Sequence, residues 1–169
     1  SKAISIEELS KIKLSDFLGD SAELFSDGFY FNFYLFPMNK HYWRMPYNGR
    51  VSSIKVNYGK GIPMPIFLER ALSYFNVNIF EKTLEKNASL GIVTQTVKEF
   101  PIGLVAIGSF NVNCIESNYD KGDLFCKGDF GGRFKLGSSM LMCFPKLDNL
   151  EKLIKIKDKV DIGEPIVRI

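Results

Sequence analysis

The sequence predicts a mainly β (α+β) fold that forms a single domain over residues 1–169, with short helices near the N-terminus. Short apolar or alternating runs, separated by glycine- and proline-rich turns, are typical of strands. An aromatic content of 14%, with 15 Phe and 7 Tyr, suits a β-rich fold. A chain of 169 residues with 46% hydrophobic residues is long enough to bury one core.

The composition limits which binding partners and which cellular compartment we expect. A net charge of +3 allows contact with an anionic membrane surface but gives no argument for nucleic acid. Three cysteines without C-x-x-C spacing and a single histidine do not make a zinc ligand set, so we expect no metal. No signal peptide and no run of 18 apolar residues occur, so we expect a cytoplasmic protein with buried free thiols. A peripheral position on the inner face of the membrane and a homodimer stay open.

The N-terminal residues predict two short helices. Apolar side chains recur at helical spacing over residues 6–14, and Ser5 is the expected N-cap of this segment. Ser15 is expected to cap a second segment over residues 16–19. Apolar residues in and after it, including Leu24 and Phe25, are expected in the core, and residues 26–28 form a turn.

The middle of the chain predicts strands joined by turns. Residues 29–36 form an aromatic run that Pro37 closes, and His41 follows in a polar loop. We expect further strands over residues 50–56, 90–97 and 102–107, a loop over 62–65 and a helix over 67–75. Residues 116–122 are expected to form a polar loop, residues 147–156 a short helix or strand, and residues 166–169 the last strand.

The stretch with chemical interest is KGDFGGRFKLGSSMLMC, residues 127–143. It predicts a turn, a loop at Gly131 and Gly132, an alternating run, and an apolar strand over 140–144. A partly buried kink at Gly137, Ser138 and Ser139 is expected between the runs. One interpretation is ordinary turn chemistry. The other is self-cleavage, in which the Ser138 hydroxyl attacks the preceding carbonyl, because a small glycine allows a strained approach. The serine would then end as an N-terminal pyruvoyl group.

Four segments of the chain resemble one known family. GRFKLGSSMLMCF resembles the cleavage segment of the phosphatidylserine decarboxylases, whose pattern includes L-G-S-[ST] before an apolar strand. FNFYLFPMNKHYWRMP, IGLVAIGSFNV and VDIGEPIV resemble three other segments of that family and occur in the same order. The resemblance implies a barrel-sandwich-like β core.

The resemblance also implies a pyruvoyl-dependent decarboxylase. Cleavage after Gly137 would give chains 1–137 and 138–169, with Ser138 as the precursor of a covalent, self-derived pyruvoyl cofactor. His41 matches the first histidine of the family's H-x-x-H-x-P pattern, which implies a proton-transfer role near the substrate. The implied substrate is phosphatidylserine, giving phosphatidylethanolamine and carbon dioxide. Some relatives take free amino acids, so an amino-acid substrate stays open.

Two departures from the family pattern concern the self-cleavage machinery. Arg44 stands where the family has its second histidine, the base for self-cleavage, and no upstream P-x-D-G turn supplies an aspartate. Arginine stays protonated and cannot act as a base, but it can hold an anionic group, so Arg44 and Ser139 are expected to bind substrate. An alternative hypothesis is an uncleaved, degenerate relative that binds an amino acid or a phospholipid headgroup. The intact L-G-S-S sequence favours the enzyme.

Overall fold

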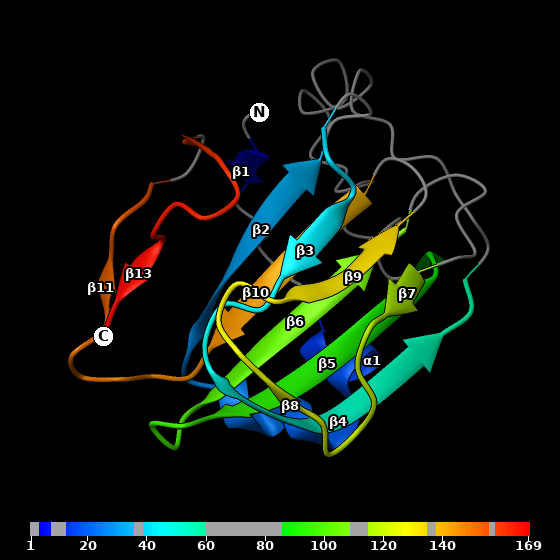
Figure 1. The fold of residues 1–169 in the computed structure, drawn as a ribbon, viewed down its shortest axis with the longest axis horizontal. Coiled ribbons are helices and arrows are strands. Elements are labelled where there is room, and N and C mark those ends of the chain that lie inside the picture. Colours follow the sequence, from blue (N-terminus) through cyan, green and yellow to red (C-terminus); the bar gives the residue numbers. More distant parts are fainter. Residues whose placement is uncertain are drawn as a thin grey trace.

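The centre of the fold is a curved, eight-stranded antiparallel sheet (Figure 1). Its strand order is β12-β1-β2-β10-β6-β5-β4-β8. In that order the strands span Lys159–Val160, Ile4–Glu7, Phe29–Leu35, Ser138–Phe144, Pro101–Ile107, Ser89–Thr96, Gly49–Asn57 and Leu124–Phe125. Neighbouring strands of the sheet are not always consecutive in the chain, and β10 lies between β2 and β6, which both precede it.

This computed structural model describes residues 4–7, 13–35, 39–59, 86–108, 115–134, 138–155 and 158–169. For residues 4–7 and 138 it describes the backbone alone. The loop expected over 62–65, the helix expected over 67–75, and Gly137 lie outside the described residues.

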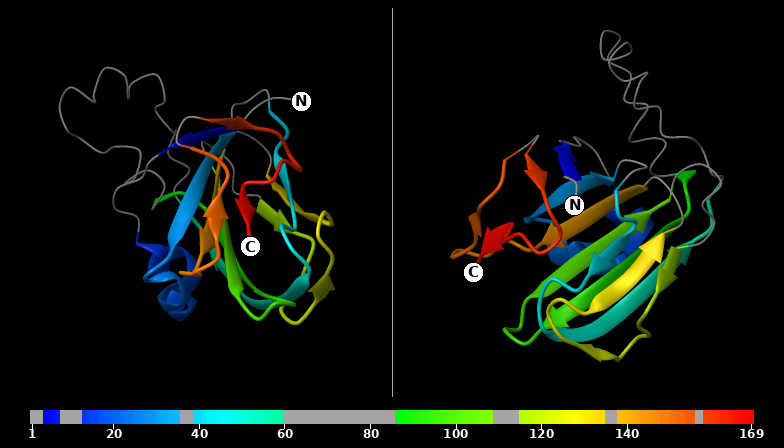
Figure 2. Two further views of the ribbon diagram at one scale, coloured as in Figure 1. Left: turned by 90° about the vertical axis from the view of Figure 1, so that its left-hand side faces the viewer. Right: turned by 45° about the horizontal axis from the view of Figure 1, so that its top comes forward.

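Two further layers cover the two faces of the large sheet. A three-stranded sheet, in the order β3 (Tyr42–Arg44), β9 (Phe130–Phe134), β7 (Ile115–Ser117), lies over one face. The helix α1 (Leu14–Leu18) and the 3-10 helix η1 (Gly19–Phe25) lie against the other face (Figure 2). A two-stranded ribbon, β11 (Glu151–Lys152) with β13 (Val167–Arg168), lies near the β12 edge. The mainly β, single-domain fold expected from the sequence is therefore confirmed.

Each face of the large sheet packs its own hydrophobic core. The core between the two sheets, here the inter-sheet core, includes Phe31, Phe33, Trp43, Phe134 and Met140. The core under the helices, here the helix-side core, includes Phe17, Leu18, Val105, Leu141 and Cys143. Successive residues of a strand point to opposite faces, so β10 contributes to both cores. Burial on both faces explains why its residues 140–144 are all apolar rather than alternating with polar ones.

The N-terminal prediction was wrong for one helix. Residues 4–7 form the strand β1, which pairs with β2 and β12, so Ser5 does not cap a helix. The backbone N–H and C=O groups of β1 bond to two strands that are distant in sequence, and the spacing of nearby apolar residues does not indicate such bonds. The second helix exists as α1, but its N-cap is Lys13 without a side-chain bond, not Ser15. Leu24 was expected in the core and is 52% exposed, whereas Phe25 is buried as predicted.

Two predicted loops and one predicted kink also prove to contain strand. Gly131 and Gly132 lie inside β9, and β7 occupies residues 115–117, at the start of the polar loop predicted over 116–122. Ser138 and Ser139 do not form a kink, since they are the first two residues of β10. The glycines are explained by the single tryptophan, since a Cβ on Gly132 would lie 2.4 Å from the Trp43 ring. Small residues here make room for an aromatic side chain rather than for a turn.

The two cysteines that the structure describes should react differently with alkylating reagents. Burial raises the pKa of the Cys143 thiol to about 12, whereas Cys126 is exposed, contrary to the expected buried thiols. Because the thiolate is the nucleophile, iodoacetamide at pH 8 should label Cys126 in the folded protein and Cys143 only after denaturation. Peptide mass mapping of labelled samples checks this. Equal labelling of both cysteines without denaturant would contradict the buried position of Cys143.

Candidate functional site

The candidate nucleophile lies at one end of the large sheet. Ser138 is the first residue of β10 and pairs with Leu35, the last residue of β2. The next residue, Ser139, pairs with Tyr34 on one side and with Ile107, the last residue of β6, on the other. The carboxyl ends of β2 and β6 therefore meet the amino end of β10 at Ser138.

His41 is held at the same end of the sheet by β9. The Phe134 N–H donates a hydrogen bond to the His41 carbonyl oxygen, with 2.9 Å between the heavy atoms. The two rings meet edge to face, with centroids 6.3 Å apart and an interplanar angle of 84°. Only residues 135–137 separate Phe134 from Ser138, so their Cα atoms are at most about 15 Å apart. The fold thus brings His41 into the neighbourhood of the predicted cleavage point.

The His41 imidazole is half-buried, and this burial favours its neutral form. Burial lowers its pKa below the ordinary 6.5, and a hydrogen bond to the backbone of Asn39 raises it by less. Its Nε2 atom is buried and has no hydrogen-bond partner among the described residues. A neutral imidazole with an unpaired ring nitrogen is the form that can accept a proton near neutral pH.

Ser139 lies on the other face of β10. It is fully buried, and its Oγ has no hydrogen-bond partner in the described part of the chain. Its pairing partner Tyr34 belongs to the helix-side core, whereas the ring that contacts His41 belongs to the inter-sheet core. The structure therefore does not bring Ser139 and His41 to one surface. The substrate contact expected of Ser139 stays a prediction.

A buried asparagine near Ser139 was missed by sequence reasoning. Asn32 is 0% exposed, and neither Oδ1 nor Nδ2 has a partner among the described residues. It pairs with Leu141, two residues beyond Ser139, so both polar side chains lie on the helix-side face of the β2–β10 pair. The available signal was one amide in the middle of an aromatic run, FYFNFYL. A buried polar group in such a run carries a desolvation cost and warrants attention.

Arg44 is engaged at the far end of β3, away from His41. Its exposed guanidinium donates from Nη1 to the Gly128 carbonyl oxygen at 2.7 Å and lies over the Tyr42 ring at 5.7 Å. The β3–β9 register shifts between Trp43 and Arg44, which brings Arg44 opposite Phe130. Arg44 thereby holds the turn that precedes β9. The substrate contact expected of it stays a prediction.

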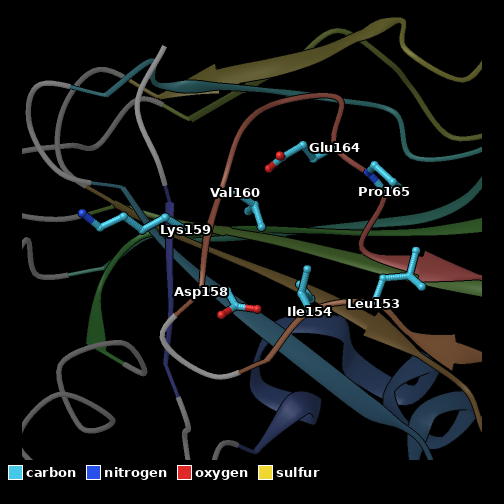
Figure 3. Close-up of a pocket in the computed structure, with 7 residues that line it drawn as sticks. All are labelled: Leu153, Ile154, Asp158, Lys159, Val160, Glu164 and Pro165. Carbon is cyan, nitrogen blue, oxygen red and sulfur yellow. The ribbon is translucent and has the colours of Figure 1, made fainter.

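Among the described residues, two of the pockets lie away from Ser138 and His41. One, of about 390 Å³, opens between β12 and the C-terminal ribbon, with Asp158 and Glu164 on opposite sides (Figure 3). These carboxylates already accept backbone hydrogen bonds from Lys155 and Asp161. β12 lies three strand positions from β10, or about 14 Å across the sheet. A second pocket, of about 630 Å³, lies at the opposite end of the sheet from Ser138, where β4 begins. Neither pocket is lined by His41 or Ser138.

The described residues form neither a metal centre nor a membrane-spanning helix. They contain no group of three or more His, Cys, Asp or Glu side chains placed to hold a metal ion. Within the same ranges, no helix is long and apolar enough to cross a bilayer.

The chain is similar to known proteins of one family. The family model described as phosphatidylserine decarboxylase matches residues 1–168. A curated protein of Shewanella sediminis (strain HAW-EB3), a phosphatidylserine decarboxylase proenzyme, is 28% identical over 185 residues. That alignment covers 96% of this chain and 61% of the relative. The chain thus spans less than two thirds of the relative's length.

Proposed function

Because the chain belongs to the phosphatidylserine decarboxylase family, we propose that it is a pyruvoyl-dependent decarboxylase that makes its own cofactor from Ser138. One observation carries the proposal: Ser138 opens β10 directly after Gly137, at the end of the sheet where β9 holds His41. A serine after a glycine at the start of a core strand has the residue type and the place that self-cleavage needs.

The strand pairing fits a protein that is cut before residue 138. β10 is a central strand, with its register to β2 running from Ser138 to Phe144 and its register to β6 from Ser139 to Cys143. Its apolar side chains enter both cores. A chain of residues 138–169 would therefore stay in place after cleavage, and its first residue would keep its position beside β2.

The chemistry would divide between the new group and the chain's own residues. Once formed, the pyruvoyl carbonyl supplies the electron sink for loss of carbon dioxide from an amine substrate. His41, whose pKa burial lowers, would take up a proton and return it near the reacting carbon. The substrate that we propose is phosphatidylserine, which would become phosphatidylethanolamine. A free amino acid is the other substrate to be tested.

Intact mass and carbon dioxide release test the proposal together. We expect the purified protein to contain a chain of residues 1–137 and a chain of residues 138–169 that begins with pyruvoyl. We also expect carbon dioxide from carboxyl-labelled phosphatidylserine in detergent micelles. Release from free amino acids, and none from the lipid, would change the substrate. An uncut chain of 169 residues that releases no carbon dioxide would contradict the proposal and leave a binding module.

A further inference from the structure

We propose that the outer face of the small sheet docks onto an anionic lipid bilayer. This face is formed by the side chains of β3 and β9 that point away from the inter-sheet core, and by the lysine just before β3. Its centre, here the outer patch, consists of Lys40, Tyr42, Arg44 and Phe130. The proposal does not depend on the proposed reaction, because vesicle binding can be measured whether or not the chain is cleaved.

Alternation along β3 leaves the side chains of the outer patch on the solvent side. Trp43 lies between Tyr42 and Arg44 and is buried in the inter-sheet core, so its two neighbours point the opposite way. Phe130 lies opposite Arg44 in the β3–β9 register and is 40% exposed. Arg44 and Lys40 are also exposed. Figure 1 shows β3 and β9 in front of the large sheet, with no described element over their outer side.

The outer patch joins two cations to two aromatic rings. The Lys40 Nζ atom lies 5.9 Å from the centroid of the Tyr42 ring, and the Arg44 guanidinium carbon lies 5.7 Å from it. The rings of Tyr42 and Phe130 have centroids 6.0 Å apart. Positive charge and apolar ring surface are therefore presented together, within one small area of the sheet.

Neither cation of the outer patch has a carboxylate partner among the described residues. Arg44 donates to the Gly128 carbonyl oxygen, which is uncharged, so the guanidinium keeps its positive charge. The two ion pairs that the described residues form lie elsewhere: one joins Arg133 to Glu116, and the other lies in the β11–β13 ribbon. The positive charge of the patch is therefore available to an anionic partner.

This combination of side chains fits the surface of an anionic bilayer. Lysine and arginine are attracted to anionic headgroups, and aromatic rings are favoured at the boundary between headgroups and acyl chains. Neither of the two pockets described above includes any side chain of the outer patch. A small ligand is usually held in a concave pocket, whereas a sheet face offers an extended surface. The patch therefore suits a broad partner better than a small one.

The opposite side of the molecule carries the opposite charge. Residues 13–28, which include α1 and η1, present four exposed acidic side chains against one lysine, Lys13. The acidic residues are Asp16, Asp20, Glu23 and Asp27. The helices and the small sheet lie on opposite faces of the large sheet (Figure 2). An anionic surface would repel the helices and attract the outer patch, which gives the protein one preferred orientation.

Sedimentation with lipid vesicles tests the proposal. The full chain should bind vesicles of phosphatidylcholine and phosphatidylglycerol, and should stay in solution with phosphatidylcholine alone. Phosphatidylglycerol has neither an amine nor a carboxylate, so it is not a substrate for the proposed reaction. Lys40→Gln should weaken binding by about fivefold, the usual contribution of one cation at such a surface. Lys13→Gln removes an exposed lysine from the opposite side and should bind as the wild type does.

Two substitutions of Arg44 separate its charge from its contact with the neighbouring turn. Arg44→Gln should weaken binding to the same vesicles by about fivefold. Arg44→Lys keeps the charge but not the guanidinium that donates to the Gly128 carbonyl, and it should bind as the wild type does. Equal weakening in both variants would mean that the turn, and not the charge, matters for binding, and would overturn the proposal.

Phe130→Trp and Leu24→Trp test which face meets the lipid. Leu24 is 52% exposed and lies on η1, on the opposite side of the molecule. In vesicles with brominated acyl chains, which quench nearby indole fluorescence, the emission added by Phe130→Trp should fall and that added by Leu24→Trp should not. Equal quenching at the two positions would overturn the proposal, as would equal vesicle binding by Lys40→Gln and Lys13→Gln. Binding to polyglutamate but not to vesicles would assign the outer patch to an acidic polypeptide instead. None of these outcomes bears on cleavage or carbon dioxide release, so the proposed function is tested separately.

Discussion

Replacing Ser138 with alanine should leave the protein as one chain of 169 residues and abolish decarboxylation. The change removes the only atom that we propose to attack the Gly137 carbonyl, so neither the ester nor the pyruvoyl group can form. Intact mass should show a single species near 19.2 kDa, where the wild type gives two smaller ones. The loss should be complete rather than partial, because no remaining group supplies the missing carbonyl.

The fold should survive this substitution. Ser138 holds its place through backbone pairing with β2, which alanine keeps. The free energy of unfolding, measured with urea, should therefore stay within about 1 kcal/mol of the value for an uncleaved chain that still has Ser138. Ser52→Ala makes the same change at an exposed position of β4 and should cleave normally. Fragments in Ser138→Ala would contradict the assignment of the nucleophile.

Most strands were predictable because each has its own run of apolar or aromatic residues. The aromatic run over 29–36 and the apolar runs near 90–97 and 102–107 correspond to β2, β5 and β6. Their side chains fill the cores on both faces of the sheet, so each strand's own sequence shows a run of apolar residues. β1 was not predictable in this way, because Ile4–Glu7 owes its conformation to pairing with β2 and β12. Non-local hydrogen bonds override a weak helical period.

The sequence names candidate residues for the site, which stay predictions, but it does not give their arrangement. Ser138 and His41 stand out in the sequence because they match motifs. Their common location depends on β3 pairing with β9, which joins residues some 90 positions apart, as Tyr42 and Arg133 do. Nothing local to Arg44 indicates that it donates to the Gly128 carbonyl. Contacts of this kind follow from the register of distant strands, which the motifs do not contain.

Gly132→Ala should cost more stability than an ordinary core substitution. A Cβ at this position would lie 2.3 Å from the Glu116 carbonyl oxygen and 2.4 Å from the Trp43 ring. The oxygen belongs to the neighbouring strand β7 and cannot move without breaking the small sheet, so the tryptophan must shift. Overpacking of this degree should lower the free energy of unfolding by about 3 kcal/mol. Urea unfolding, followed by fluorescence of the single tryptophan, measures it directly.

The same variant should also lower decarboxylation, because β9 carries Phe134, which holds His41. Gly122→Ala is the matched comparison, since its Cβ meets open space and only the positive φ of 99° is strained. It should cost roughly 1–2 kcal/mol, leave the Trp43 emission maximum unchanged and decarboxylate normally. Equal stability and emission in the two variants would mean that Trp43 does not rest on Gly132. The position of His41 would then not depend on how tightly the small sheet packs.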